Sequence, residues 1–215
     1  RTMAPERQHL RERSDTMKDY LNLPLSELLD DAQSRQPTPG GGAIAAMVGA
    51  LAATMAAMSA NFTLGPAKYK SVEPQVRQLL DDLLSQRERF ADLMQQDMQA
   101  YTTVLAAYKL PKESDDQQAA RREAIQQAVR RAMDVPLQTA RAALETLQSA
   151  CRLAPIANAN LLSDVAVAAI LAAAVFDCAK LNVEVNIPLC DDDRLVAETR
   201  RALAEMRQLC DDLKS

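Results

Sequence analysis

The sequence predicts an all-α protein, a helical bundle with Ala-rich central helices and one long helix that assembles as a dimer. Glycine is scarce (5 residues), tryptophan is absent and aromatic residues make up 3%, whereas Ala and Leu abound. This composition favours packed helices over β-sheets. With 215 residues, 48% of them hydrophobic, the chain can bury the core of one domain. We therefore expect a single domain over residues 19–215, preceded by a flexible tail over residues 1–18.

The first two helices are predicted on either side of a strong breaker. Residues 24–35 have the pattern of a short helix with Ser26 as its N-cap. The breaker is the run Pro-Thr-Pro-Gly-Gly-Gly at 37–42. A helix rich in small residues should follow at about 43–60, and its small side chains let neighbouring helices approach closely. Residues 61–70 are expected to form a loop.

A long amphipathic helix is predicted from Pro74 to about Leu110. Its apolar residues recur at the three- and four-residue spacing of a helical stripe. At about 1.5 Å per residue this helix would span roughly 50 Å. Because that length exceeds what a compact domain of this size can cover, the helix needs partners along its length. A bundle that pairs with a second copy satisfies this need.

The second half of the chain predicts four further elements. Two helices, at about 119–134 and 136–150, should be separated or kinked at Pro136. A helix at 163–181 is apolar almost all round and should lie at the centre of the bundle. A charged helix at 191–213 should cover the surface.

The composition excludes several classes of function. A net charge of -4 argues against nucleic-acid binding. The four cysteines form no CxxC pair, which argues against a zinc site or a disulfide framework and favours a reduced, cytoplasmic setting. The only histidine is His9, so neither a Ser-His-Asp triad nor a His-rich metal site can form within one chain. We predict no metal site, and any general acid or base must be Asp, Glu, Lys, Tyr or Cys.

A membrane location is not expected, although two runs are strongly apolar. Residues 40–65 carry no charge and could span a bilayer by length, but they are Ala-rich and contain several polar side chains. The run from Val165 to Phe176 is too short to span. No signal peptide is apparent, so we interpret both runs as buried central helices.

Several residues could carry chemistry, and each also has a structural interpretation. The triple glycine could bring backbone N–H groups close to a ligand, or simply form a tight helix entry. Ser163 and Asp164 could cap a helix, or hold a carboxylate against an apolar core. Asp97 lies on the apolar stripe of the long helix, so it should have a partner, either as a structural hub or as a site residue. The asparagines that flank the apolar helices are suggestive without being specific.

Taken together, these segments resemble the carboxy-terminal domain of formiminotransferase-cyclodeaminase and the stand-alone methenyltetrahydrofolate cyclohydrolases. The resemblance covers about residues 24–212, with the matching segments at 37–63, 97–112, 123–137 and 158–187 in the family's order. It implies an all-α fold, at least a homodimer, and a folate substrate. It also implies no cofactor beyond that substrate and no nucleic-acid or membrane partner.

The resemblance further implies two reactions and a set of site residues. The first is hydrolysis of 5,10-methenyltetrahydrofolate to 10-formyltetrahydrofolate, and the second is cyclisation of 5-formiminotetrahydrofolate with release of ammonia. Asp164 is expected as the electrostatic or basic group, with Lys68 and Tyr69 as proton donors or contacts to the substrate tail. The expected substrate-binding residues are Pro39, Gly40, Gly41, Gly42, Asn61, Thr63, Asp97, Asn160, Ser163 and Asn182.

Cyclohydrolase is the preferred reaction, because the sequence shows no fused formiminotransferase domain. Three alternatives stay open: the cyclodeaminase reaction, a family member recruited to a non-folate substrate, and a non-catalytic helical interaction module. The segment Gly65-Pro66-Ala67-Lys68-Tyr69 favours the second of these, since the family commonly carries two more lysines there.

Overall fold

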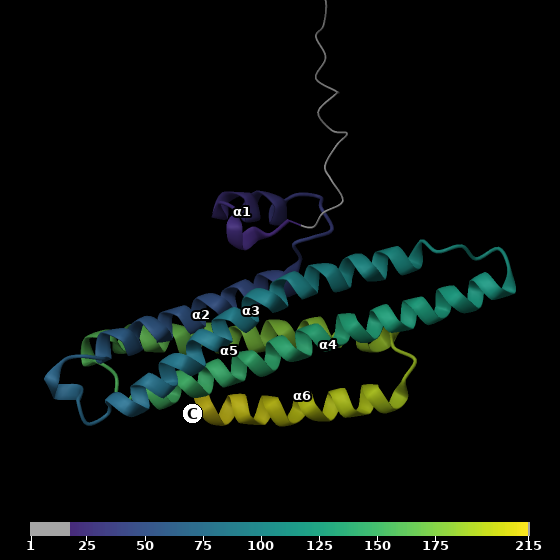
Figure 1. Cartoon of the computed structure of the whole chain (residues 1–215). Coiled ribbons are helices and arrows are strands. Elements are labelled where there is room, and N and C mark those ends of the chain that lie inside the picture. Colours follow the sequence, from purple (N-terminus) through teal and green to yellow (C-terminus); the bar gives the residue numbers. More distant parts are fainter. Residues whose placement is uncertain (1–17, 215) are drawn as a thin grey trace, which may run out of the picture.

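The computed structural model describes residues 18–214, which form an elongated bundle of α-helices (Figure 1). No strand occurs within these residues, which confirms the all-α prediction. The α-helices are α1 (Leu25–Gln33), α2 (Gly41–Thr63), α3 (Glu73–Tyr108), α4 (Asp115–Leu153), α5 (Leu162–Glu184) and α6 (Asp193–Lys214). Short 3-10 turns occupy Tyr20–Asn22, Ala67–Tyr69, Ala159–Leu161 and Ile187–Leu189. The tail predicted over residues 1–18 lies outside the described residues except for Lys18.

Helix α2 packs against α3, α4 and α5, as its small side chains predict. Most of its alanines are completely buried. At Gly49 the packing is close, because a Cβ there would lie 2.4 Å from Cε1 of the Phe90 ring. Small residues therefore allow α2 to pack among three other helices with its backbone near their side chains.

Helix α3 confirms the predicted long helix over 36 residues. Its stripe of apolar residues is fully buried, from Val76 and Leu79 near one end to Phe90 and Leu93 in the middle. The carboxy-terminal end of α3 and the amino-terminal end of α4 extend past the other helices (Figure 1). The long helix is thus a core element over most of its length and leaves the bundle only at this tip.

Of the two alternatives predicted at Pro136, a separation or a kink, the separation into two helices does not occur. A single helix, α4, runs for 39 residues with Pro136 inside it. Val135, Pro136 and Leu137 are all buried, so tertiary packing on both sides of the proline holds the helix together. Its start is set by a capping box in which Ser114 and Gln117 exchange side-chain and backbone hydrogen bonds.

Two predicted caps are wrong. Ser26 lies inside α1, whose N-cap is Pro24, and no side chain caps that helix. Ser163 is the second residue of α5, which begins directly after the 3-10 turn Ala159–Leu161. It is Asn158, at the start of that turn, whose side chain accepts the capping hydrogen bond. Because the 3-10 turn runs directly into α5, the cap lies before the turn and not at Ser163. The local sequence did not indicate this turn.

Helix α5 is longer and more exposed than predicted. It reaches 23 residues. The expectation that its apolar run was too short to span a membrane is wrong, because the helical segment Ala159–Leu189 is long and apolar enough to do so. The same is true of Gly41–Thr63. Core helices of soluble proteins pass the same test, and α2 is mostly buried. On α5, however, Ile170 is 68% exposed and Val185 is 66% exposed. One face of this helix is therefore apolar and uncovered within the described chain.

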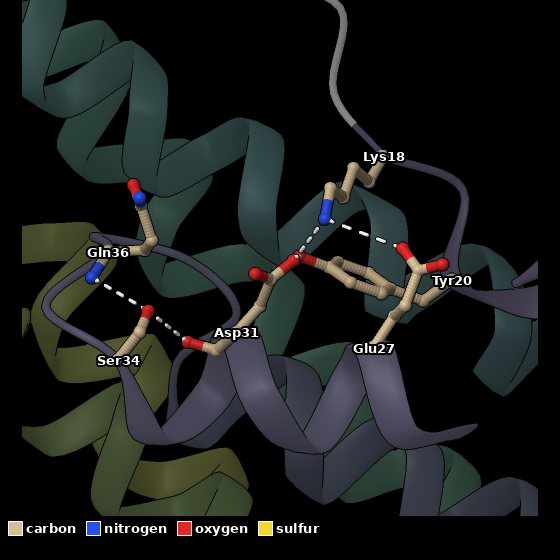
Figure 2. Close-up of polar contacts among 6 residues, drawn as sticks. All are labelled: Lys18, Tyr20, Glu27, Asp31, Ser34 and Gln36. Carbon is tan, nitrogen blue, oxygen red and sulfur yellow. Dashed lines mark hydrogen bonds and ion pairs between the residues drawn. The ribbon is translucent and has the colours of Figure 1, made fainter. Parts of the chain in front are cut away.

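The amino-terminal unit is held together by polar contacts around Asp31 of α1 (Figure 2). Lys18 Nζ lies 2.6 Å from Asp31 Oδ2, and the Tyr20 hydroxyl donates to the same oxygen at 2.8 Å. Beyond the helix, the Ser34 hydroxyl donates to the Asp31 carbonyl at 2.7 Å, and the Gln36 N–H donates to Ser34 Oγ. These bonds direct the chain from α1 into the glycine-rich loop.

Helix α6 confirms the predicted charged final helix, and one of its contacts with the bundle is made by an arginine. The Arg207 guanidinium lies over the Phe176 ring of α5, 4.7 Å from its centroid, and pairs with Asp177. The charged face of α6 stays at the surface, while Leu203 and Cys210 are buried.

Candidate active site

A cavity of about 350 Å³ opens where the start of α2 meets α3, α4 and the end of α5. The glycine-rich loop, Asp97 of α3, Pro136 of α4, Asn182 of α5 and Asn186 just after α5 all contribute to its wall. The lining residues are Pro37, Thr38, Gly40, Gly41, Gly42, Asp97, Ala100, Tyr101, Val104, Ala132, Pro136, Asn182, Val185, Asn186 and Leu189. A partly apolar cavity with few polar groups is typical of a small-molecule site.

Asp97 caps helix α2 from a neighbouring helix. The N-cap of α2 is Gly40, which has no side chain to bond the first free N–H groups. The Ala43 N–H instead donates to the Asp97 carboxylate. A Cβ at Gly42 would lie 2.2 Å from Asp97 Oδ1, so only glycine lets the carboxylate come this close. The triple glycine and Asp97 therefore form one structural unit.

Burial raises the pKa of the Asp97 carboxyl above its ordinary value, and the hydrogen bond from the Ala43 N–H offsets only part of this effect. The carboxylate consequently holds a proton more readily than a solvated one. A carboxyl group in a cavity with a raised pKa is suited to accept and return a proton.

The end of α5 and the segment just after it supply two amide side chains to the same cavity. Asn182 Nδ2 donates to the Cys178 carbonyl at 2.8 Å, and its side chain lies beside Gly41. Asn186 Nδ2 donates to the carbonyls of Asn182 and Ala132, at 2.8 Å and 3.1 Å. These bonds to backbone oxygens fix the orientation of the Asn186 amide. Two predicted binding elements, the glycines and Asn182, are therefore brought together with Asp97.

A second group of predicted residues lies at the opposite end of α2. The Tyr69 hydroxyl donates to Asn158 Oδ1 and accepts from the Ala159 N–H, both at 3.2 Å. Thr63, which is buried, accepts from the Asn158 N–H at 2.8 Å. Together these contacts hold the loop that follows α2 against the turn that precedes α5.

The remaining predicted residues surround this second group. Lys68 Nζ lies 4.5 Å from the Tyr69 ring centroid, and a hydrogen bond from Lys68 lowers the pKa of the Tyr69 hydroxyl. Asn61, Asn160 and Ser163 are exposed, and Asp164 is half-buried in the first turn of α5. Pro39 is buried behind the glycine-rich loop and does not line the cavity.

The predicted site residues thus divide between the two ends of α2. Gly41 and Thr63 are 22 residues apart on one helix, which corresponds to roughly 33 Å at 1.5 Å per residue. Within one chain, Asp164, Lys68 and Tyr69 do not reach the cavity that contains Asp97. The prediction from sequence did not place Pro136 or Tyr101 in a site, and it noted Asn186 only among the asparagines that flank the apolar helices. The proline inside a helical pattern was a signal for the first of these, but no spacing indicated Tyr101.

The described residues do not suggest a metal centre. Within residues 18–214, no three His, Cys, Asp or Glu side chains gather in a way suited to an ion.

Comparison with known proteins assigns the family. Residues 24–205 match the formiminotransferase-cyclodeaminase family. The chain belongs to this family. It is 39% identical over 179 residues to a methenyltetrahydrofolate cyclohydrolase of Methylorubrum extorquens, covering 83% of this chain and 86% of that one. It is 30% identical to the formimidoyltransferase-cyclodeaminase of Rattus norvegicus, of which it covers only 35%.

A solved structure supports the same assignment. The formiminotetrahydrofolate cyclodeaminase of Thermotoga maritima superimposes with a TM-score of 0.81 at 33% identity, covering 90% of this chain and 92% of that one. The all-α bundle described above is therefore the fold of this family.

Proposed function

We propose that this chain is a methenyltetrahydrofolate cyclohydrolase, which hydrolyses 5,10-methenyltetrahydrofolate to 10-formyltetrahydrofolate. The observation that carries the proposal is the buried carboxyl of Asp97 beside the start of α2 in the cavity. The similarity to the Methylorubrum cyclohydrolase supports the choice of reaction, because the two chains match over most of their lengths. No cofactor beyond the folate is needed for this hydrolysis, and a cytoplasmic setting suits it.

In this reaction Asp97 serves as the general base. The methenyl carbon joins N5 and N10 in a cationic amidinium, which a nearby carboxylate stabilises. Asp97 accepts a proton from water as the water oxygen attacks that carbon, which gives a neutral carbinolamine. The bond between this carbon and N5 then breaks, N5 takes the proton from Asp97, and the carbinolamine hydroxyl loses its proton as the formyl C=O forms. One proton is released overall.

The start of α2 can stabilise the oxygen during this step. The first intrahelical bond of α2 runs from the Ile44 N–H to the Gly40 carbonyl, so the N–H groups of Gly41 and Gly42 precede it. Both glycines line the cavity. Free N–H groups at a helix start favour negative charge, here the partial charge on the oxygen of the carbinolamine.

The functional unit is proposed to be a homodimer in which the uncovered face of α5 pairs with a second copy. That face carries Val167, Ile170, Leu181 and Val185, all at least 45% exposed. Contiguous exposed apolar residues mark association surfaces. If the α5 helices of two copies run antiparallel, the end that bears Asp164 and Tyr69 in one copy lies beside the Asp97 cavity of the other. Predicted site residues that are far apart within one chain, such as Asp164 and Asp97, would then lie close together across the dimer.

The proposed dimer is tested by placing a charge on the exposed apolar face of α5. Ile170→Glu should yield a monomer in light scattering and lower activity at least tenfold, because a carboxylate cannot be buried there without a partner. Leu209→Glu on α6, where the residue is 38% exposed, is the matched control and should remain dimeric and active. A fully dimeric Ile170→Glu protein contradicts the proposed interface.

The reaction itself is tested with purified protein and 5,10-methenyltetrahydrofolate. The absorbance of the methenyl group should decay faster than the uncatalysed rate, in proportion to protein concentration, with 10-formyltetrahydrofolate as product. A folded protein that neither accelerates the decay nor binds the compound at saturation contradicts the proposal.

The cyclodeaminase reaction is the second candidate, and the similarity to the Thermotoga maritima structure favours it. In that reaction N10 attacks the formimino carbon and ammonia leaves, which requires the same cavity with Asp97 as a proton carrier. Ammonia release from 5-formiminotetrahydrofolate distinguishes the two, and we expect the kcat/KM for this substrate to be the lower one.

A further inference from the structure

Helix α4 has a carbonyl at the cavity wall that lacks its helical donor because of the internal proline. Pro136 has no backbone N–H, so the carbonyl of Ala132, four residues earlier, lacks its α-helical donor. Both residues line the cavity. A half-buried carbonyl of this kind needs another donor.

Asn186 supplies that donor. Its Nδ2 donates to the Ala132 carbonyl at 3.1 Å and to the Asn182 carbonyl at 2.8 Å. Both hydrogens of the amide are therefore used on carbonyl oxygens. Because an amide oxygen could not face two carbonyl oxygens, the orientation of the side chain is settled and the remaining atom, Oδ1, is an acceptor.

Oδ1 of Asn186 is available to a ligand. No donor within residues 18–214 forms a hydrogen bond with it. Among the described residues, Nε of Arg121 is the only side-chain polar atom that is both inaccessible to solvent and without a hydrogen-bond partner. Oδ1 of Asn186 also has no partner, so it must be accessible to solvent. Asn186 lies in the cavity wall together with Asp97 and Gly42. The cavity thus contains a rigid, unoccupied acceptor in addition to its carboxyl group.

We infer that Asn186 orients the substrate by accepting a hydrogen bond from one of its N–H groups, and that Pro136 is a positioning residue acting through Asn186. This inference rests on the proposed function. A tetrahydropterin presents N–H donors at its 2-amino group, N3 and N8, and a fixed carbonyl acceptor suits any of them. The proline creates the bond that holds the amide still, so less conformational entropy is lost on binding.

A double-mutant cycle separates this role from a purely structural one. Asn186→Leu removes the acceptor and also leaves the Ala132 carbonyl unpaired. Pro136→Ala restores an N–H four residues after Ala132, so in that background Asn186 is no longer needed to satisfy the carbonyl. The KM for 5,10-methenyltetrahydrofolate, kcat and the melting temperature are measured for wild type, both single variants and the double variant.

We expect Asn186→Leu to raise KM about tenfold in the wild-type background, the effect of losing one hydrogen bond, with kcat changed less than threefold. In the Pro136→Ala background, where the amide is no longer held, the same change should raise KM by a smaller factor, roughly threefold. Pro136→Ala alone should raise KM only modestly, and an unchanged KM would exclude positioning through Asn186. Asn186→Leu should lower the melting temperature only when Pro136 is present, because only then is the Ala132 carbonyl left without a donor. Gln138→Leu, two residues further along α4 and outside the cavity, is the control and should leave KM unchanged.

Two further outcomes overturn the inference. A KM that is unaffected by Asn186→Leu excludes substrate contact, and a KM effect that disappears in the Pro136→Ala background assigns Asn186 a structural role only. Both require an active wild-type enzyme, so they are distinct from failure of the proposed function, in which the wild type itself shows no turnover.

Discussion

The two ends of α2 both carry ionisable side chains but provide different chemical environments. At the amino-terminal end, the Asp97 carboxyl is buried against glycine backbone, and burial raises its pKa. At the carboxy-terminal end, Lys68 and Tyr69 form a contact at the surface, and the hydrogen bond between them lowers the pKa of the tyrosine. The comparison teaches that the presence of an ionisable residue near an apolar helix says little about its reactivity. Its burial and its hydrogen-bond partners decide that.

The largest expected effect is the loss of activity on removing the Asp97 carboxylate, compared with the same change at Asp164 near the other end. Asp97→Asn should lower kcat by ~10²–10⁴-fold, the usual contribution of a general base, while the carbonyl of the new amide can still accept from the Ala43 N–H. Asp164→Asn, the matched change at the other end, should lower kcat less than about tenfold, or ~1.4 kcal/mol of barrier. Steady-state assays of both variants check this. The reverse order would assign the chemistry to the half-buried Asp164.

A smaller effect is expected from the glycine that admits Asp97. In Gly42→Ala the new Cβ would lie 2.2 Å from Asp97 Oδ1, so the carboxylate must move, and a displacement of about 1 Å can cost up to ~10²-fold in rate. Gly40→Ala is the control, because no atom lies within 4 Å of a Cβ placed there. If both alanine variants retain wild-type kcat, the close approach of Asp97 has no catalytic importance.

The smallest effect concerns stability as a function of pH. Because the pKa of Asp97 is higher in the folded than in the unfolded chain, its contribution to stability is complete at pH below the unfolded value, about 3.9, and is lost as pH rises through the folded value. Asp97→Asn should therefore raise the free energy of unfolding relative to wild type at pH 7, and this gain should shrink towards pH 4. Denaturant melts at both values measure it.

The same shift predicts the pH dependence of the reaction. The kcat/KM of wild type should fall as pH decreases through the Asp97 pKa, because the base becomes protonated, and this limb should lie above the range of an exposed aspartate. A limb at the position of an ordinary carboxyl would indicate that an exposed group, and not Asp97, is the base.

Much of the architecture could be read from residue patterns. The long helix over 74–110, the Ala-rich helix after the triple glycine and the charged final helix are each within a few residues of α3, α2 and α6. The separation at Pro136 was wrong because burial on both sides, and a donor from Asn186, compensate for the missing N–H. Propensity describes a helix in isolation, whereas a buried helix is also stabilised by its neighbours.

The candidate site was less accessible to prediction. The sequence singled out Asp97 because a carboxylate on an apolar stripe needs a partner, and the structure supplies the Ala43 N–H. It could not identify Asp97 as the buried carboxylate in preference to Asp164, because Asp97 lies on an apolar helical stripe and Asp164 precedes an apolar helix. Only the packing of α3 against the start of α2 buries the first, while the first turn of α5 leaves the second partly in water.

The sequence alone therefore determined the helical class, the order of the elements and the family resemblance, because periodicity, breakers and motifs are local properties. The tertiary structure decided which ionisable groups share a cavity, which pKa values shift and which apolar face stays open on α5. The physical reason is that burial and hydrogen bonding depend on residues distant in the chain, and these meet only after α2, α3, α4 and α5 have packed together.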